Sequence, residues 1–361
     1  MLRYVHFTVE GATERVVAVL VWNAADLKGA QPYVSRMVNE MKKLGAGYFK
    51  GGGKEARGGR KKEDGGGDGD DVVDDDNDDD ERTSLWHSIW VHCHDDEGNS
   101  IYNRKEGSGR WFLVHGPRFS REDVFPPVAA LLGPSSRSSS SSSSSRGSSP
   151  ACLYFTPQVF RQANFGAFSA QVGVDVLDAV RESGADTVLE LYGGTGALSL
   201  NLWAMDKLSP VEKRLRWIKC SEINPAAEEC FAKGMGAMKK ATAGKGPFSS
   251  RCDVSFHACS AEDALLEENL GDGAAAIIVD PPRAGLSDEV ARWLATPKKG
   301  SSYVDLPDVL IYCSCNFASL ARDLDVLLGD KKGCWKIRRA TGYLLFPGAD
   351  HIETVVTMVR S

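Results

Sequence analysis

The chain has 361 residues, enough for one large or two ordinary domains, and 42% apolar with 25% charged residues is the usual balance of a globular protein. No apolar run is long enough to cross a bilayer, so a membrane protein is not expected. The formal charge of −6 originates in residues 51–82, which carry about −7. The near-neutral remainder neither favours nor excludes a nucleic-acid partner.

Nine cysteines are scattered along the chain, and none stands in a CxxC pair or at the spacing of a zinc site. We therefore expect no metal centre. An odd number of cysteines without a signal peptide predicts reduced thiols and an intracellular location, cytoplasmic by default. The first residues show no transit pattern, so we expect import into an organelle only if a leader precedes this sequence.

Residues 1–132 are predicted to form a small α+β domain, because apolar and polar residues alternate in four segments and recur with helical spacing in a fifth. The predicted strands are residues 4–11, 15–24, 85–94 and 110–116, and the predicted helix is 32–45. Residues 51–82 are rich in glycine and acidic residues, and residues 133–150 form a serine tract. Both segments lack core-forming residues, so we expect a disordered acidic insertion and a disordered linker.

Residues 151–361 are predicted to form a Rossmann-like α/β domain with a doubly wound, mostly parallel sheet, because strands and helices alternate along the chain. A helical stretch over 157–183 is expected to open the domain. The strands that follow are predicted at residues 187–192, 216–223, 254–260, 275–282, 309–315, 342–346 and 353–359.

A glycine turn at residues 193–196 lies between a predicted strand and a predicted helix, and Glu222 ends the next strand. This combination is typical of a nucleoside cofactor site, since the turn lets a ligand approach the backbone and the carboxylate accepts hydrogen bonds from ribose. Glu190, just before the turn, would repel the pyrophosphate of NAD but suit the positive charge of S-adenosylmethionine. Asp280 also ends a strand, at the edge where such sheets bind ligands.

Six motifs follow one another in order: FRQAN (160–164), ELYGGTG (190–196), SEI (221–223), DPPRAGL (280–286), YCSCNFASLARDL (312–324) and FPGADHIETV (346–355). With them the chain resembles the S-adenosylmethionine-dependent RNA uracil-C5 methyltransferases, which act on tRNA or rRNA. The resemblance covers residues 151–361 and is thinner over the first block. It implies a class I methyltransferase fold, in which the last strand of the sheet is antiparallel, with S-adenosylmethionine as cofactor and RNA as partner. We expect a monomer.

The resemblance also implies roles for individual residues. Those expected to bind S-adenosylmethionine are Gln162, Tyr192, Glu222 and Asp280, and those expected to act on the substrate are Cys315, as nucleophile, and Glu353, as base. The chemistry needs both roles. A thiolate that adds to uracil C6 makes C5 nucleophilic, and a base must remove the C5 proton before the adduct can break down.

Positive charge near Cys315 would lower the pKa of its thiol, and Arg283 and Arg322 are the candidates. Cys313 stands where the family usually has an aliphatic residue, so we expect a buried packing residue there. His351 has more than one interpretation: it orients Glu353, it contacts phosphate, or it simply packs.

The chain departs from the family pattern at Gly193, where cysteine is common, at Phe317, where proline is usual, and at Gly348. It also begins within the family's central domain, without the small β-barrel RNA-binding domain that precedes it in the family. No four-cysteine iron–sulfur motif like that of some members is present, so we expect no cluster. We expect RNA affinity to come from elsewhere in the chain, or the N-terminus to be truncated.

Four other functions remain open on the sequence alone. An RNA-binding or RNA-folding protein could keep the fold without turnover, although the presence of both Cys315 and Glu353 argues against it. RNA cytosine-C5 methyltransferases also carry a cysteine near a strand end, but they tend to have another in the Asp-Pro-Pro region, where this chain has none. Adenine amino-methyltransferases place an aromatic residue where Arg283 stands. An NAD dehydrogenase is the weakest alternative.

Overall fold

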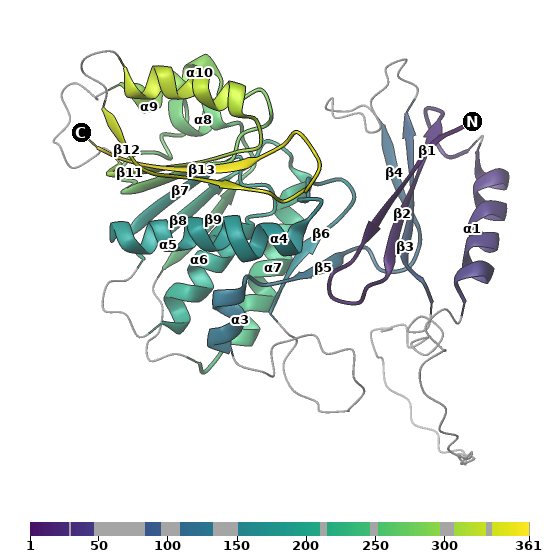
Figure 1. Cartoon of the computed structure of the whole chain (residues 1–361). Helices are drawn as coiled ribbons and strands as arrows, with labels where there is room; N and C mark the ends of the chain where they lie inside the picture. Colours follow the sequence, from purple (N-terminus) through teal and green to yellow (C-terminus); the bar gives the residue numbers. More distant parts are fainter. Residues whose placement is uncertain are drawn as a thin grey trace. The chain divides into compact units, whose positions relative to one another are not determined.

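A computed structural model describes residues 1–28, 30–46, 84–94, 109–132, 151–209, 215–245, 252–296, 307–329 and 334–360 (Figure 1). The predicted acidic insertion, 51–82, and the predicted serine-rich linker, 133–150, lie outside these residues. The chain divides into two compact units, Met1–Ser120 and Arg121–Ser361.

The first unit is a four-stranded sheet with a helix packed on one face. In sheet order its strands are β1 (Leu2–Val9), β2 (Val16–Asn23), β3 (Trp86–His94) and β4 (Arg110–His115), and the helix is α1 (Gln31–Gly45). Strands β2 and β3 run parallel, and the other neighbouring pairs run antiparallel. Each element predicted here is present within two residues of its expected bounds, which confirms the small α+β domain.

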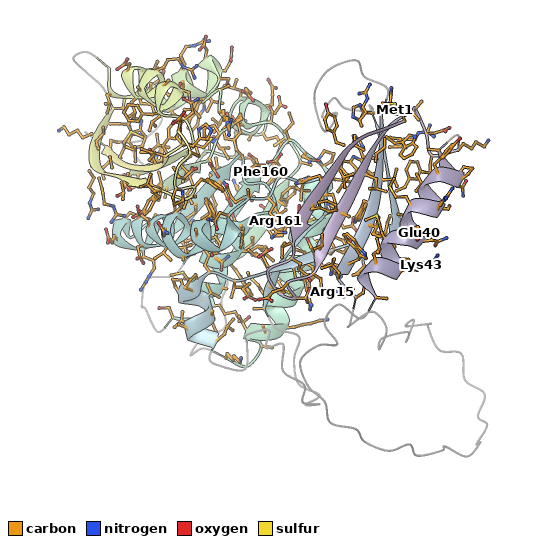
Figure 2. All side chains as sticks on the ribbon, turned by 45° about the vertical axis from the view of Figure 1, so that its right-hand side comes forward. Met1, Arg15, Glu40, Lys43, Phe160 and Arg161 are labelled. Carbon is orange, nitrogen blue, oxygen red and sulfur yellow. The ribbon has the colours of Figure 1, made fainter. Side chains whose placement is uncertain are left out.

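Helix α1 packs on this sheet because its apolar residues recur every three or four positions. Val34 and Val38 are buried in one core cluster with Ile89 of β3. The exposed side of the helix carries an ion pair between Lys43 and Glu40, 2.8 Å apart (Figure 2). Both side chains are well exposed, so this pair contributes little to stability.

The second unit is built on a seven-stranded sheet. In sheet order the strands are β12 (Trp335–Tyr343), β13 (Glu353–Arg360), β11 (Val309–Ser314), β10 (Ala276–Val279), β7 (Thr187–Leu191), β8 (Trp217–Ser221) and β9 (Asp253–His257). Strands β7 to β11 are parallel, whereas β13 pairs antiparallel with both β11 and β12. The predicted mostly parallel sheet with an antiparallel last strand is confirmed.

Helices cover both faces of this sheet (Figure 1). One face carries α5 (Val174–Ser183), α6 (Ala197–Leu208) and α7 (Ala226–Thr242), and the other carries α8 (Ala261–Leu266), α9 (Asp288–Ala295) and α10 (Phe317–Leu328). On the second face, Leu189, Ile277 and Leu310 of neighbouring strands form a fully buried core with Leu265 and Leu320 of the helices. This double covering makes the central strands almost continuously apolar.

The first predicted helix of this unit begins later than expected. Residues 157–164 form turns and irregular chain, and helix α4 (Phe165–Phe168) continues through the π-helix η2 (Ser169–Gly173) into α5. The side chain of Asn164 accepts a hydrogen bond from the backbone N–H of Ala167 at 3.3 Å. An asparagine cap of this kind marks the start of a helix, so the predicted start at 157 was wrong.

The strand predicted at residues 342–346 lies earlier in the chain in the structure. Strand β12 begins at Trp335 and ends at Tyr343. It lies at an edge of the sheet, and most of its residues are exposed or half-buried. Its exposed positions hold polar and apolar residues alike, for example Lys336 and Ile337, so the alternation that predicts a strand is weak there.

Three short elements were not predicted: β5 (Ser120–Asp123), α3 (Pro126–Leu132) and β6 (Cys152–Phe155). Strand β5 pairs with β6, and α3 packs against α6. The backbone N–H of Phe125 donates to Oδ1 of Asn201 at 2.9 Å. These contacts group residues 121–132 with the second unit, although the expected first domain extends to 132.

Gly196, in the turn between β7 and α6, should not tolerate a larger residue. Gly196 has φ of +73°, and a Cβ there would collide with the ring of Phe231. We expect Gly196→Ala to lower the free energy of unfolding by about 2 kcal/mol, from backbone strain and steric conflict. Urea unfolding would measure the change.

Gly236→Ala is the matched control, because Gly236 lies within α7 and a Cβ there meets no atom within 4 Å. Alanine should stabilise this helix by about 0.5–1 kcal/mol. An unchanged free energy of unfolding for Gly196→Ala would contradict the close approach to Phe231.

Candidate functional site

The predicted site residues gather at the carboxyl ends of the parallel strands. Glu222 follows β8, Asp280 follows β10, and Cys315 follows β11. The register of β11 and β13 pairs Ser314 with Thr354. The next residues along the two strands, Cys315 and Glu353, therefore meet at the same edge of the sheet.

The glycine turn after β7 brings backbone close to several neighbours. The N–H of Gly193 donates to the carbonyl of Ser221 at 2.9 Å, and the N–H of Gly196 donates to the carbonyl of Gly193 at 2.8 Å. A Cβ on Gly194 would meet no atom within 4 Å, so the turn opens onto free space there. Tyr192 has φ of 59°, the kind of local backbone strain that gathers at functional sites.

The structure explains why glycine stands at position 193. A Cβ there would collide with Sγ of Cys220, which is fully buried on β8. The side chain of Cys220 thus fills the space that a cysteine at position 193 would need.

Glu222 is held in place by two backbone donors. Its Oε2 accepts from the N–H of Gly194 at 3.0 Å, and its Oε1 accepts from the N–H of Asn224 at 2.9 Å. The amide of Asn224 donates in turn to the carbonyl of Gln158 at 2.9 Å. This carboxylate is therefore fixed beside the glycine turn.

Glu190, Asp280 and Glu353 form a group that we call the carboxylate cluster. Burial raises the pKa of Glu190 to about 7, although Ser199 donates to it from both its N–H and its hydroxyl. Burial also raises the pKa of Glu353 to about 7. Burial raises the pKa of Asp280 well above its usual value, and the charges of Glu353 and Glu190 raise it further. Crowded carboxylates of this kind favour a positively charged ligand.

Cys315 is half-buried at the end of β11. Burial raises the pKa of its thiol, and so do the carboxylates of Glu353 and Asp280. Arg283 acts in the opposite direction, because its positive charge near the thiol lowers that pKa. The side chain of Asn316 accepts from the backbone of Ala318 at 2.9 Å and caps α10 just behind the thiol.

Cys313 lies in a different environment from Cys315. It is fully buried within β11, and burial raises the pKa of its thiol well above the usual value. A neutral, enclosed thiol of this kind behaves as a small apolar side chain.

The predicted residue Gln162 is half-buried in the segment before α4. Two residues later, the amide of Asn164 donates to the carbonyl of Leu345 at 2.8 Å. This bond ties the segment of Gln162 to the loop between β12 and β13 that leads to Glu353. His351 lies in the same loop and is exposed.

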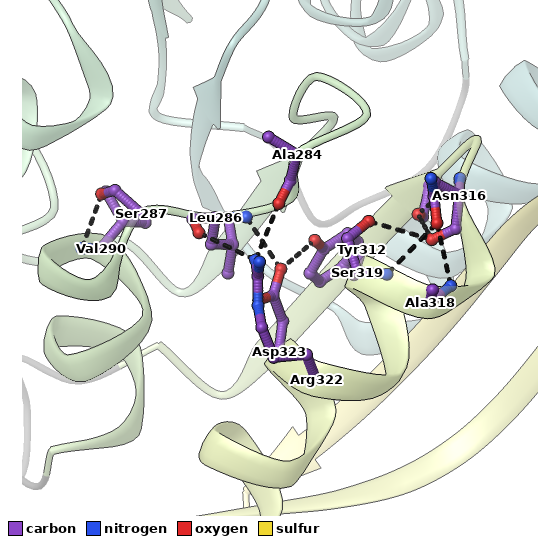
Figure 3. Close-up of polar contacts among 11 residues, drawn as sticks. Ala284, Leu286, Ser287, Val290, Tyr312, Asn316, Ala318, Ser319, Arg322 and Asp323 are labelled. Atoms are coloured by element: carbon purple, nitrogen blue, oxygen red, sulfur yellow. Dashed lines mark hydrogen bonds and ion pairs between the residues drawn. The ribbon is translucent and has the colours of Figure 1, made fainter.

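Arg322, the second candidate for lowering the pKa of Cys315, donates to Asp323 and to the carbonyl groups of Ala284 and Leu286 (Figure 3). The charge that lowers that pKa in the structure is that of Arg283. Sequence reasoning missed Asp323 altogether. It is buried, and the hydroxyl of Tyr312 donates to it at 2.6 Å.

The sequence model of the family described as tRNA (Uracil-5-)-methyltransferase matches residues 153–361. The chain belongs to this family. An uncharacterized RNA methyltransferase of Protochlamydia amoebophila is 29% identical over 277 residues, which are 77% of this chain and 56% of that protein. The 23S rRNA (uracil(747)-C(5))-methyltransferase RlmC of Shewanella putrefaciens is 26% identical over 209 residues, 58% of this chain and 45% of the relative. The chain thus spans about half the length of these relatives.

Among solved structures, the tRNA (uracil-54, C5)-methyltransferase of Pyrococcus abyssi, in complex with S-adenosyl-L-homocysteine, aligns with a TM-score of 0.52. The alignment covers 99% of this chain and 60% of that one, at 17% sequence identity. This similarity confirms the class I methyltransferase fold.

Within the described ranges, no group of three or more His, Cys, Asp or Glu residues could hold a metal ion. No helix in the same ranges combines the length and apolar character that spanning a membrane requires.

Proposed function

We propose that this protein transfers a methyl group from S-adenosylmethionine to C5 of a uridine in tRNA or rRNA, through a covalent adduct with Cys315. The observation that carries the proposal is the meeting of Cys315 and Glu353 at the ends of β11 and β13, where the Glu353 carboxylate raises the pKa of the thiol. We further propose that residues 121–132 and 151–361 belong to the methyltransferase domain and that Met1–Ser120 is an accessory domain. The insertion 51–82 and the linker 133–150 complete this proposed organisation.

The donor groups of the site fit S-adenosylmethionine. Oε1 of Glu353 is buried without a hydrogen-bond partner among the described residues, and the carboxylate cluster as a whole suits a cation. Gln162, Tyr192, Glu222 and Asp280 would hold the cofactor, with Glu222 facing ribose. When bound, S-adenosylmethionine supplies an electrophilic methyl group.

The protein's own residues would supply the remaining chemistry. The Cys315 thiolate forms a bond to C6 of uracil, and the electron pair of the C5–C6 double bond becomes available for C5 to attack the methyl group. Glu353 then accepts the C5 proton, and the electrons of that C–H bond re-form the double bond as the bond between C6 and sulfur breaks. Arg283 stabilises the thiolate before attack and after release.

Exposed apolar side chains near the site support an RNA substrate. Phe317, two residues after Cys315, is 72% exposed, and Leu344, Phe346 and Ile352 are exposed in the loop before Glu353. Unstacked bases pack on side chains of this kind, and uracil must leave its stack to meet a thiolate.

The test is covalent capture. The protein is incubated with labelled S-adenosylmethionine and with tRNA and rRNA fragments that contain 5-fluorouridine. We expect a labelled protein–RNA complex that survives denaturing electrophoresis, because fluorine at C5 cannot leave as a proton.

Two outcomes would overturn the proposal. Retention of S-adenosylmethionine without any covalent complex would favour an RNA-binding protein without turnover. A complex that forms only with RNA containing 5-fluorocytidine would favour a cytosine-C5 methyltransferase.

A further inference from the structure

Arg322 and Asp323 of α10 bind the loop that follows β10, and we call this pair the Arg322–Asp323 clamp (Figure 3). Oδ2 of Asp323 accepts from the N–H of Leu286 at 2.8 Å and from the hydroxyl of Tyr312 at 2.6 Å. Nη2 of Arg322 donates to the carbonyls of Ala284 at 2.8 Å and Leu286 at 3.2 Å, and its Nε donates to Oδ1 of Asp323 at 2.9 Å. Each half of the clamp thus binds the backbone of the same three-residue segment.

Gly285, at the centre of that segment, shows how closely the loop approaches the clamp. Its φ is +83°, and a Cβ there would lie 2.5 Å from Oδ2 of Asp323 and 2.6 Å from Nη2 of Arg322. Asp323 is 2% exposed, so the bonds that it accepts from Leu286 and Tyr312 form away from water, where they are strong, whereas the side chain of Arg322 is 56% exposed. The loop is therefore fixed to α10 at a definite distance.

The clamp joins the two segments that meet at Cys315. Arg283, whose positive charge lowers the pKa of the thiol, immediately precedes the clamped segment, and α10 begins two residues after the thiol. Arg322 itself is committed to Asp323 and to backbone carbonyls. Its positive charge thus acts on the loop, and any effect on the thiol passes through Arg283.

We propose that the Arg322–Asp323 clamp is a positioning device that holds Arg283 against the thiol of Cys315. The inference rests on the proposed function only in taking Cys315 as the reactive thiol. The charged groups that face this thiol are Arg283 from the loop after β10, Asp280 at the end of β10, and Glu353 from β13. Two of these three are acidic, so the thiol depends on Arg283 for its positive neighbour.

The experiment measures the alkylation rate of Cys315 by iodoacetamide as a function of pH, with peptide mass spectrometry to identify the cysteine. It needs neither RNA nor cofactor, so a failure of the proposed function would leave the readout intact. Asp323→Asn keeps the size of the side chain and removes its charge. We expect the apparent pKa of Cys315 to rise by about one unit, which is a tenfold slower alkylation at pH values below that pKa.

Arg292→Ala is the matched control, because it removes an exposed arginine that pairs with Glu289 at 3.4 Å on the neighbouring helix α9. Its alkylation profile should equal that of the unaltered protein. Arg322→Lys keeps the charge but has a single nitrogen, which cannot replace both the Nε bond to Asp323 and the Nη2 bonds to the two carbonyls, so it should shift the profile in the same direction as Asp323→Asn. It also serves as the test variant if Asp323→Asn does not fold.

A double-mutant cycle separates positioning from simple stabilisation. Arg283→Ala alone should raise the apparent pKa of Cys315, and adding Asp323→Asn to it should shift the pKa no further. The proposal is overturned if the two shifts add. It is equally overturned if a folded clamp variant, with an unchanged circular dichroism spectrum, keeps the alkylation profile of the unaltered protein.

Discussion

Replacing Cys315 by alanine is expected to abolish covalent capture of RNA and to lower the methylation rate by more than about a thousandfold. No described neighbour offers a second thiol in the same position, because Cys313 is fully buried, and burial together with nearby carboxylates raises the pKa of its thiol well above the usual value. Transfer of labelled methyl groups to RNA, measured at saturating RNA, gives the rate.

Cys313→Val is the control for this experiment. Valine is close in size to cysteine and apolar, so a buried site should accept it at less than about 1.5 kcal/mol, with turnover retained. Turnover that survives Cys315→Ala, or that is lost in a folded Cys313→Val variant, would reverse the assignment of the two cysteines.

Replacing Glu353 by glutamine is expected to lower turnover by about a hundred- to ten-thousandfold while a covalent complex accumulates with ordinary uridine-containing RNA. Loss of the Glu353 charge favours the Cys315 thiolate and so spares the first step. Without a base, the C5 proton stays and the adduct cannot break down. Denaturing electrophoresis would detect the accumulated complex.

Glu353 should also determine how the methylation rate depends on pH. The pKa of Glu353 is raised to about 7, so the carboxylate is a proton acceptor above that value and is neutral below it. At S-adenosylmethionine concentrations well below saturation, where the rate reports the free protein, the rate should therefore fall as the pH drops through about 7. Glu289→Gln, which changes an exposed carboxylate on α9, should leave turnover and its pH profile unchanged. Normal turnover of Glu353→Gln without any complex would exclude Glu353 as the base.

The sequence predicts well those strands and site residues that a short stretch of neighbouring residues identifies. The buried, mostly apolar strands β10 and β11 stand out, and Asp280 and Cys315 come directly after them. Chain order therefore suffices to bring these two residues to one edge of a parallel sheet.

The clamp could not be predicted in this way. Tyr312 is typical of a core strand residue and Asp323 is typical of a charged residue on a helix surface, yet the two side chains bond to each other. The hydrogen bond between them depends on how α10 packs on the sheet. The local sequence pattern does not predict this packing. The same limit applies to α3, whose assignment to the second unit depends on its contact with α6.

The carboxylate cluster has a thermodynamic consequence for ligand binding. Glu190 and Glu353 each have a pKa of about 7 in the free protein, so near neutral pH both exist as mixtures of protonated and charged forms. A cation that enters the cluster lowers these pKa values and expels protons to the solvent. Its affinity should therefore increase as the pH rises through 7, and the heat of binding should depend on the buffer that takes up those protons.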